Sequence, residues 1–365
     1  MNKVLKKGLE GTVVAETTIS LVDGEKGKLV YRGEPAEILA EDRSFEEVCW
    51  MLWNGNLPVK GELEKVKNDF LLNRELPEYV FNILRELPQG MPMMSAVRTG
   101  ISALGDEYYQ WPPTINEAVK LTAAVPVIIA ARWRMQNELE PVPPHSELDH
   151  VENFLYMLTG EVPHHSHVKA MTAYFILTME HGLNASTFAA RVIASTEADM
   201  ASAVTGAIAA MKGSLHGGAP SGVFDMLEQI KHKIKAEPWL REQIEGGKKL
   251  MGFGHRVYKT TDPRAEALKK ITSQLTQDDP WLELAHYVEN KAITLLHEYK
   301  PGRKLYTNVE FYAAAVLRAA DIPAELFTPV FTASRMAGWT AHIIEQAEDN
   351  RIYRPQAIYR PTEKL

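Results

Sequence analysis

The sequence contains little cysteine and little net charge. Cys49 is the single cysteine among 365 residues, so no disulfide can form within the chain. Because Cys49 falls in an apolar helical pattern, we expect a buried, unreactive thiol in a reducing compartment. A net charge of −7 argues against a general nucleic-acid-binding protein, so a local basic cluster has to serve a particular small anion.

Long apolar runs and targeting signals are also absent from the sequence. The most apolar run, residues 121–131, contains a proline and is far shorter than the ~20 residues of a membrane-spanning helix. Residues 1–16 hold several lysines but neither the apolar core nor the cleavage signature of a signal peptide. We therefore expect a cytoplasmic protein without membrane or nucleic-acid partners.

Motifs for common cofactor chemistries are missing as well. The sequence has no GxSxG, no Walker loop and no complete GxGxxG. His164, His165 and His167 lie close together but lack the i, i+4 spacing of a zinc-binding helix, which favours a surface loop. We expect neither a metal site nor a tightly bound cofactor.

The residues that are present predict an almost entirely helical protein. The apolar fraction of 45% and the charged fraction of 24% are typical of a globular protein. Residues 10–33 alternate apolar and polar positions and contain several glycines, which predicts a small hairpin. Beyond them the apolar spacing is helical. The predicted helices cover residues 44–55, 61–72, 77–87, 93–104, 116–138, 150–159, 166–181, 186–212, 219–235, 237–249, 264–276 and 281–299.

Shifts in composition along the chain predict two domains. Segment 186–212 consists largely of small residues, which let helices approach closely in a bundle or at a subunit contact, although a plain core helix fits the pattern as well. From residue 216 the helices become rich in Lys and Glu, and Ala and aromatic residues return over 309–345. We expect an all-α fold in which a smaller, more exposed domain is inserted before the larger one is complete.

One short stretch, MGFGHRVYKTTDPR, concentrates the chemistry of a ligand site. Gly252 and Gly254 let backbone amides approach a ligand closely, and His255 follows them. Asp262 precedes a proline, which predicts an N-cap and a helix whose first turn holds Arg264. The N–H groups and dipole of that turn favour an anion. The stretch predicts a site for an anionic ligand, although an ordinary loop before a capped helix fits it too.

A second stretch, GSLHGGAP, places His216 just before a helix N-terminus. The positive end of the helix dipole disfavours imidazolium, so we expect a neutral ring. A neutral imidazole N–H can hydrogen-bond an oxygen that becomes negative in a transition state. A histidine that merely caps its own helix is the alternative interpretation.

Three further motifs carry single candidate residues. In EHGLNAST, His181 ends one helix, and Asn184 or Ser186 can cap the next. In YTNVEFY, an N-cap at Asn308 places Glu310 in a first helical turn, where a base would be ionised and held in position. The late arginine candidates are Arg335 in TASRMAG and Arg354 in IYRPQA.

Taken together, these motifs resemble the citrate synthase family. They follow one another along the chain in that family's order, and the similarity runs from GLEGTVVAET to IYRPQA. The resemblance implies a mainly α-helical homodimer with a large and a small domain in each chain and minor β structure at the N-terminus. It assigns residues 1–214 and 319–365 to the large domain and 215–318 to the small one, which closes over the substrates. The resemblance is to the short bacterial and archaeal members, so we expect the chain to begin where they begin.

The resemblance also implies a reaction, the condensation of acetyl-CoA with oxaloacetate and water to citrate and CoA in the tricarboxylic acid cycle. His216 would hydrogen-bond the thioester oxygen while Glu310 removes a methyl proton, and His255 would protonate the carbonyl of oxaloacetate as the enol attacks it. Citryl-CoA is then hydrolysed. The residues implied for oxaloacetate are His181, His255, Arg264, Arg335 and, from the partner subunit, Arg354. Those implied for CoA are Leu250, Met251, Gly252, Phe253, Gly254, Lys259 and Asn308.

One residue departs from the family pattern. The family usually has aspartate where this chain has Glu310, and the extra methylene moves the carboxylate by about 1.5 Å unless the backbone compensates. A misplacement of that size can cost about a hundredfold in rate. Two alternatives therefore stay open. One is a 2-methylcitrate synthase using propionyl-CoA, since one methylene is worth about 1–3 kcal/mol of discrimination. The other is a weakly active or non-catalytic protein that binds oxaloacetate or CoA.

Overall fold

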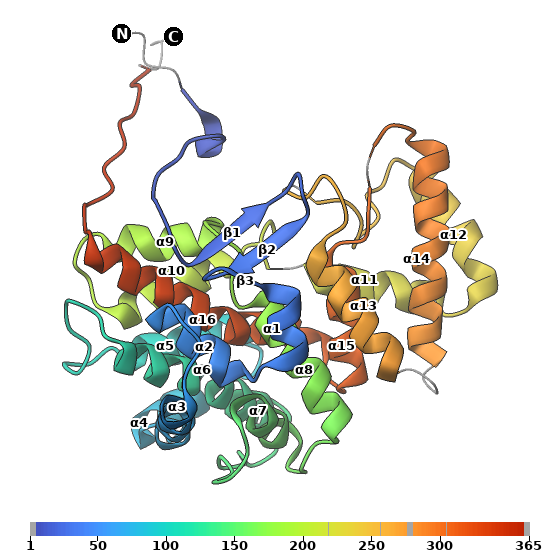
Figure 1. Ribbon diagram of the computed structural model, residues 1–365. Coiled ribbons are helices and arrows are strands. Elements are labelled where there is room, and N and C mark those ends of the chain that lie inside the picture. The colour runs from blue at the N-terminus through green and yellow to red at the C-terminus, as the bar shows by residue number, and fades with distance from the viewer. Residues whose placement is uncertain (1–4, 218, 256, 276–279, 304, 361–365) are drawn as a thin grey trace, which may run out of the picture.

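Helices make up most of the chain, in agreement with the sequence prediction (Figure 1). The computed structural model describes residues 5–217, 219–255, 257–275, 280–303 and 305–360. Within these ranges the all-α fold with minor β structure is confirmed. The helices are α1 (Ala36–Asp42), α2 (Phe45–Asn54), α3 (Lys60–Leu72), α4 (Glu78–Glu86), α5 (Met93–Ala103), α6 (Ile115–Gln136), α7 (His150–Thr159), α8 (His165–Thr178), α9 (Ala185–Ala194), α10 (Met200–Met211), α11 (Ala219–Ile230), α12 (Lys233–Glu245), α13 (Pro263–Leu275), α14 (Pro280–Tyr299), α15 (Val309–Ala319) and α16 (Phe327–Glu348), with short 3₁₀ helices η1 (Lys7–Leu9) and η2 (Ala324–Leu326).

A small antiparallel sheet precedes the helices. Strand β1 (Ser20–Asp23) pairs with β2 (Lys28–Tyr31), and β2 pairs with β3 (Glu34–Pro35). The hairpin predicted within residues 10–33 is confirmed, but its strands begin only at β1. Tyr31 attaches the sheet to the helices, because its buried hydroxyl donates a hydrogen bond of 2.9 Å to a backbone carbonyl just beyond α8.

The long helix α16 lies at the centre of the larger group of helices (Figure 1). It packs against α2, α6, α8, α9 and α10, and nearly every side chain from Phe327 to Ile343 is buried. In the middle of the helix the indole N–H of Trp339 donates to Ser186 Oγ at 3.1 Å. This burial fixes the direction of every side chain of α16, including that of Arg335.

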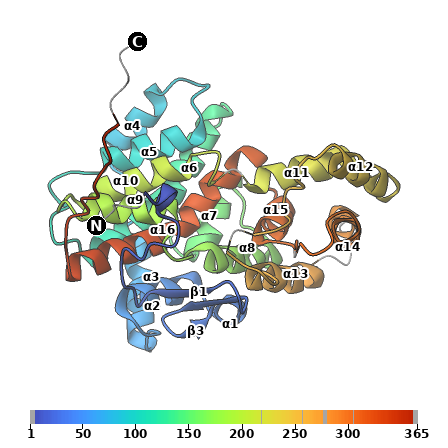
Figure 2. The same ribbon diagram turned by 90° about the horizontal axis from the view of Figure 1, so that it is seen from above.

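A second group of helices, α11 to α14, lies to one side of the first (Figure 2). Helix α12 packs against α14, and α11 and α13 pack against α15. Helices α13 and α15 also contact α8, so they connect the two groups. The division of the chain at residues 215 and 318 stays a prediction.

One segment predicted as continuous is interrupted. Segment 186–212 forms two helices, α9 and α10, because the carboxylate of Asp199 accepts a hydrogen bond of 2.9 Å from the N–H of Ser202 and caps a new helix. The Ala- and aromatic-rich segment 309–345, for which no helix bounds were predicted, contains α15 and most of α16, with Pro323 in the connection. A local cap or proline ends a helix even where the apolar pattern continues.

Other local predictions are confirmed. Ser44 and Glu47 form a capping box at the start of α2, and Gly55 ends that helix with a left-handed conformation. Cys49 is fully buried, and burial raises the pKa of its thiol well above the usual range.

Among the described residues, no helix combines the length and the apolar character that crossing a membrane requires.

Candidate active site

His181 lies in the turn between α8 and α9. Helix α8 ends at Thr178, not at His181 as predicted, and Gly182 has a left-handed φ of +60°. The carboxylate of Glu180 accepts hydrogen bonds from the backbone N–H of Gly182 and, at 2.8 Å, from Ser20 Oγ. Burial, reinforced by nearby arginines, lowers the pKa of His181 well below its usual range, so its ring is neutral.

His255 is oriented by the backbone of its own loop. Its Nδ1 accepts hydrogen bonds of 3.0 Å from the N–H groups of Val257 and Tyr258, so a neutral ring carries its proton on Nε2. Burial and the charge of Arg264 lower the pKa of His255 to about 4. Nε2 lies 3.4 Å from Arg264 Nη2, so an imidazole donor and a guanidinium donor face the same space. Such a pair suits an oxygen acceptor of an anionic ligand.

Arg264 is held by a buried carboxylate. Asp262 Oδ1 accepts from Arg264 Nε at 3.0 Å and Oδ2 accepts from Nη2 at 2.9 Å, the two-point geometry of a strong ion pair. Burial alone would lower the pKa of Arg264, but the charge of the Asp262 carboxylate outweighs this effect, so the pKa lies above its usual range. Asp262 Oδ2 also accepts from the N–H of Val309 at 3.0 Å. Asp262 Oδ1 also accepts from the backbone N–H of Arg264 at 3.1 Å, which confirms the predicted cap of α13, so one carboxylate caps α13 and connects it to the start of α15.

Glu310 lies in the first turn of α15, as predicted. Asn308 caps this helix by accepting a hydrogen bond of 3.1 Å from the N–H of Glu310. Burial raises the pKa of the Glu310 carboxyl to about 7, although Arg264 and Arg335 act in the opposite direction. A carboxyl with this pKa can both take up and release a proton near neutral pH.

Arg335 projects from α16 toward the same space. It is only 2% exposed, its Nε donates to the carbonyl of Thr178 at 2.7 Å, and its guanidinium lies over the Phe331 ring at 4.7 Å. Burial lowers the pKa of Arg335, and the negative charge of Glu180 counteracts this effect. Hydrogen bonds within the described residues thus engage Nε, while the terminal nitrogens remain to bind an anion.

His216 lies between α10 and α11, three residues before α11 begins. Its Nε2 is 2.7 Å from the hydroxyl of Ser186, which also lies 2.7 Å from Asn184 Oδ1 and accepts the indole N–H of Trp339. Asn184, rather than Ser186, caps α9. Burial and the charge of Arg335 lower the pKa of His216 to about 4, so its ring is neutral at pH 7, as expected from the sequence.

Five of the predicted residues come together from four parts of the chain. They are His181, His255, Arg264, Glu310 and Arg335. The rings of His181 and His255 have centroids 5.7 Å apart, and Tyr258 joins them, with its hydroxyl 3.2 Å from His181 Nε2. Arg264 lies 5.7 Å from the Tyr258 ring. Arg264 and Arg335 both act electrostatically on Glu310 and on His181. The result is a site with neutral donors, two guanidinium groups and one weakly acidic carboxyl.

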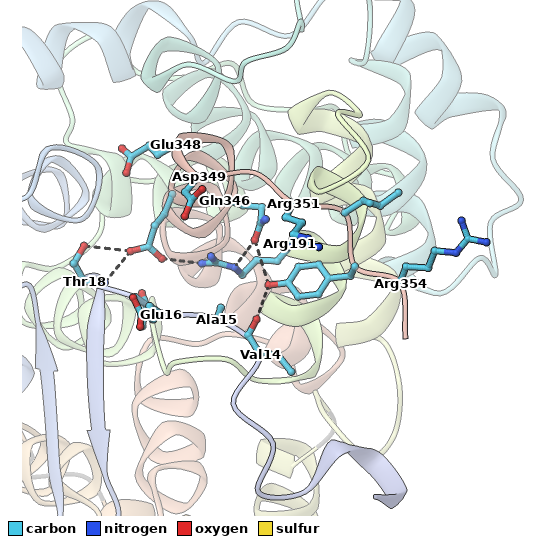
Figure 3. Close-up of a pocket in the computed structure, with 14 residues that line it drawn as sticks. Val14, Ala15, Glu16, Thr18, Arg191, Gln346, Glu348, Asp349, Arg351 and Arg354 are labelled. Carbon is cyan, nitrogen blue, oxygen red and sulfur yellow. Dashed lines mark hydrogen bonds and ion pairs between the residues drawn. The ribbon is translucent and has the colours of Figure 1, made fainter. Parts of the chain in front are cut away.

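Arg354 is not brought to this cluster within one chain. It is exposed in the segment after α16 and lines a cavity of about 780 Å³ between that segment and residues 14–18. Figure 3 shows Arg191 directed into the cavity, where it pairs with Glu345 at 2.8 Å, whereas the Arg354 side chain extends away from this pair. The predicted contribution of Arg354 to a partner subunit's site stays a prediction.

The loop predicted to contact CoA is shaped by its glycines. Gly252 and Gly254 have φ of +85° and +79°. The N–H of Gly254 donates to the carbonyl of Tyr306 at 2.7 Å, and Asn308 donates to both glycine carbonyls at 2.9 Å, so these glycines serve backbone pairing. Leu250 and Phe253 are buried, Met251 is half-buried, and the side chain of Lys259 is exposed. Contact between this loop and CoA stays a prediction.

The three clustered histidines lie at the start of α8, which corrects the prediction of a loop, whereas His164 and His165 are exposed, as predicted. His164 caps α8 by accepting from the N–H of Ser166, and His165 is the first residue of that helix. No group of three potential metal ligands occurs among the residues that the structure describes.

Sequence reasoning missed residues that act through their neighbours. Glu180 precedes His181 and fixes its turn, and Tyr258 lies within the stretch already singled out. Their positions beside candidate histidines were a usable signal. The direction of each side chain, however, depends on contacts with distant parts of the chain.

Comparison with known proteins identifies the chain as an acyltransferase-type enzyme. It belongs to the citrate synthase family, since residues 8–356 match the family model described as "Citrate synthase, C-terminal domain". It is 40% identical to the citrate synthase of Haloferax volcanii over 98% of this chain and 96% of that protein. It is 38% identical to a 2-methylcitrate synthase of Mycobacterium tuberculosis over 97% and 90% of the two chains. The citrate synthase of Thermoplasma acidophilum, solved as a ternary complex with carboxymethyl coenzyme A and oxaloacetate, superposes with a TM-score of 0.91 at 32% identity, covering 99% of this chain and 98% of that one.

Proposed function

We propose that this chain condenses acetyl-CoA with oxaloacetate and water to give citrate and CoA. The observation that carries the proposal is the convergence of His181, His255, Arg264 and Arg335 on one space beside the carboxyl of Glu310. Two guanidinium groups match the two carboxylates of oxaloacetate. The Thermoplasma relative, whose structure contains oxaloacetate and a CoA derivative, supports this choice of ligands.

Each reacting proton has a residue to carry it. The Glu310 carboxylate takes a proton from the methyl group of acetyl-CoA, and neutral His216 stabilises the thioester oxygen as the enol forms. The enol carbon then bonds to the carbonyl carbon of oxaloacetate, and His255 Nε2–H gives its proton to that oxygen. Water finally cleaves the thioester of citryl-CoA, which releases CoA and citrate.

The choice between acetyl-CoA and propionyl-CoA is tested by initial rates of CoA release. With oxaloacetate present, we expect kcat/KM to be about 10-fold or more higher for acetyl-CoA, since one methylene is worth roughly 1–3 kcal/mol. The rates are followed with a thiol reagent, and assays without oxaloacetate are the control. A preference for propionyl-CoA would make the chain a 2-methylcitrate synthase, the activity named for the Mycobacterium tuberculosis relative.

We further propose that the chain acts as a homodimer. Its first and last described segments lie side by side, since residues 5–12 and 356–358 line one cavity, and both segments extend away from the helices (Figure 1). Large apolar side chains on them are exposed, which favours coverage by a second copy. The exposed side chains are Leu5, Leu9, Val13, Ile352, Ile358 and Tyr359.

Mixing two inactive variants tests whether Arg354 acts across the dimer. Arg354→Ala and His216→Ala are each expected to be nearly inactive alone. In a mixed dimer, one site has both an intact His216 and the partner subunit's Arg354. Random reassociation of equal amounts should then restore about one quarter of wild-type activity, because half of the dimers are mixed and each has one complete site.

Differently tagged subunits allow the mixed dimers to be isolated and assayed. Unmixed samples treated in the same way are the control. Verified mixed dimers without recovered activity would contradict a role of Arg354 in the partner's site, and a monomer in light scattering would contradict the dimer itself.

A further inference from the structure

The β1–β2 hairpin lies against both turns that carry the candidate histidines of the oxaloacetate site. Figure 1 shows its tip beside the loop that precedes α13. Ser20 and Val22 of β1 contact the turn between α8 and α9. The two turns are far apart in sequence and belong to different groups of helices. They meet directly where the Tyr258 hydroxyl lies 3.2 Å from His181 Nε2.

The hairpin tip contacts the backbone that orients His255. The N–H of Lys259 donates to the carbonyl of Gly24 at 2.8 Å. Gly24 also lies so close to Val257 that a Cβ at Gly24 would overlap the carbonyl oxygen of Val257. Val257 is one of the two residues whose N–H binds His255 Nδ1. Any shift of the loop away from Gly24 therefore moves the group that fixes the imidazole.

The second glycine of the tip makes an equally close contact. A Cβ at Gly27 would lie 2.6 Å from Thr260 Cγ2 and 2.9 Å from the carbonyl oxygen of Thr261. Gly27 also has a φ of +61°, which favours glycine for the backbone alone. Gly24 has no such backbone requirement, so its missing side chain is explained by the contact with the loop.

Strand β1 fixes the other turn. Ser20 Oγ donates to Glu180 at 2.8 Å, and the same carboxylate holds the N–H of Gly182. A Cβ at Gly182 would lie 3.2 Å from Val22 Cγ2, so the turn packs directly on the strand. The pairing of β1 with β2 makes the hairpin a stiff connection between Glu180 at one end and Val257 at the other.

We propose that the β1–β2 hairpin is a positioning element that sets the separation of His181 and His255, with Gly24 as its positioning residue. The proposal rests on the proposed function for the identity of the ligand, oxaloacetate. Neither Gly24 nor Ser20 touches the reacting groups. They act by holding two loops whose histidines must meet one substrate.

The test is Gly24→Ala, which adds one methyl group at the contact with Val257. We expect KM for oxaloacetate to rise and kcat to fall, each about tenfold, because small displacements of binding groups are costly in rate. The melting temperature should fall modestly, because the loop must shift to admit the methyl group, and KM for oxaloacetate should change more than KM for acetyl-CoA. Gly90→Ala is the matched control, since a Cβ at Gly90 meets nothing within 4 Å and its φ is not positive.

Two further measurements separate positioning from folding and from failure of the proposed function. Hydrogen exchange of the apo chain should be faster at the Lys259 amide in Gly24→Ala than in the wild type or in Gly90→Ala. If Gly24→Ala does not fold, Ser20→Ala tests the other end of the hairpin, with a smaller rise in KM for oxaloacetate expected.

Wild-type kinetics and exchange in Gly24→Ala would overturn the positioning role. A wild-type chain that neither binds oxaloacetate in calorimetry nor releases CoA would overturn the proposed function, and exchange would then decide the positioning role alone.

Discussion

Replacing His216 with alanine is expected to lower kcat about 10²- to 10³-fold, the usual cost of losing a donor to a developing negative oxygen. The ring is half-buried and has a pKa of about 4, so it is a neutral donor throughout the physiological range. Its side-chain contact is with the Ser186 hydroxyl, which keeps Asn184 and Trp339 as partners when the imidazole is removed. The variant should therefore fold normally and bind oxaloacetate with unchanged affinity.

His167→Ala provides the matched control. His167 is also a half-buried histidine near a helix N-terminus, in the first turn of α8, but it lies outside the candidate site. Turnover is measured as CoA release and folding as the melting temperature of both variants. Turnover of His216→Ala within about twofold of the wild type would remove His216 from the mechanism. A matching loss in His167→Ala would show that the effect is structural.

Local signals in the sequence predicted the parts of the site that depend on helix ends. Asp262 before proline predicted the cap that places Arg264 in the first turn of α13, and Asn308 placed Glu310 in the same way. Both predictions depend on backbone N–H groups within three residues of the cap, so they could be made without knowing which distant segments pack nearby. The neutral state of His216 was also predicted, from the neighbouring helix N-terminus, but in the folded chain it results from burial and from the charge of Arg335.

Contacts between distant segments could not be predicted in this way. The pattern of small residues in 186–212 gave no sign of the break at Asp199, and nothing in the stretch around Gly252 and Gly254 indicated that these glycines pair with residues 306–308. The roles of Glu180 and Gly24 depend on the hairpin folding onto two loops more than 150 residues away from it. Sequence spacing contains no information on such packing, so these residues become visible only in the folded chain.

Burial shapes the acid–base properties of the whole site in one direction. It lowers the pKa of His181, His216 and His255 and raises that of Glu310, so burial drives these four groups toward their neutral forms. The positive charge then resides on Arg264 and Arg335. This arrangement suits a dianionic substrate, because the arginines supply charge while the imidazoles donate hydrogen bonds without competing for protons.

Glu310→Asp is expected to raise kcat about tenfold to a hundredfold while KM for oxaloacetate stays unchanged. The shorter side chain withdraws the carboxylate by about 1.5 Å, to the place where the family usually has its base. The residues that face oxaloacetate are untouched, so affinity for that substrate should hold. The variant is compared with the wild type in CoA-release assays, with Glu310→Gln as the control that keeps the length of the side chain but removes the base.

The pH profile tells whether Glu310 is the base. Its pKa is raised from the ordinary value to about 7, and the ionised form is the active one, so wild-type kcat/KM should rise with pH through about 7 and fall about tenfold per unit below it. Glu310→Gln should lose this acid limb along with about 10²- to 10⁴-fold in kcat.

A lower kcat in Glu310→Asp would show that the backbone already positions the glutamate correctly. Absence of CoA release from both forms, with oxaloacetate still bound, would instead make the chain a non-catalytic oxaloacetate-binding member of its family.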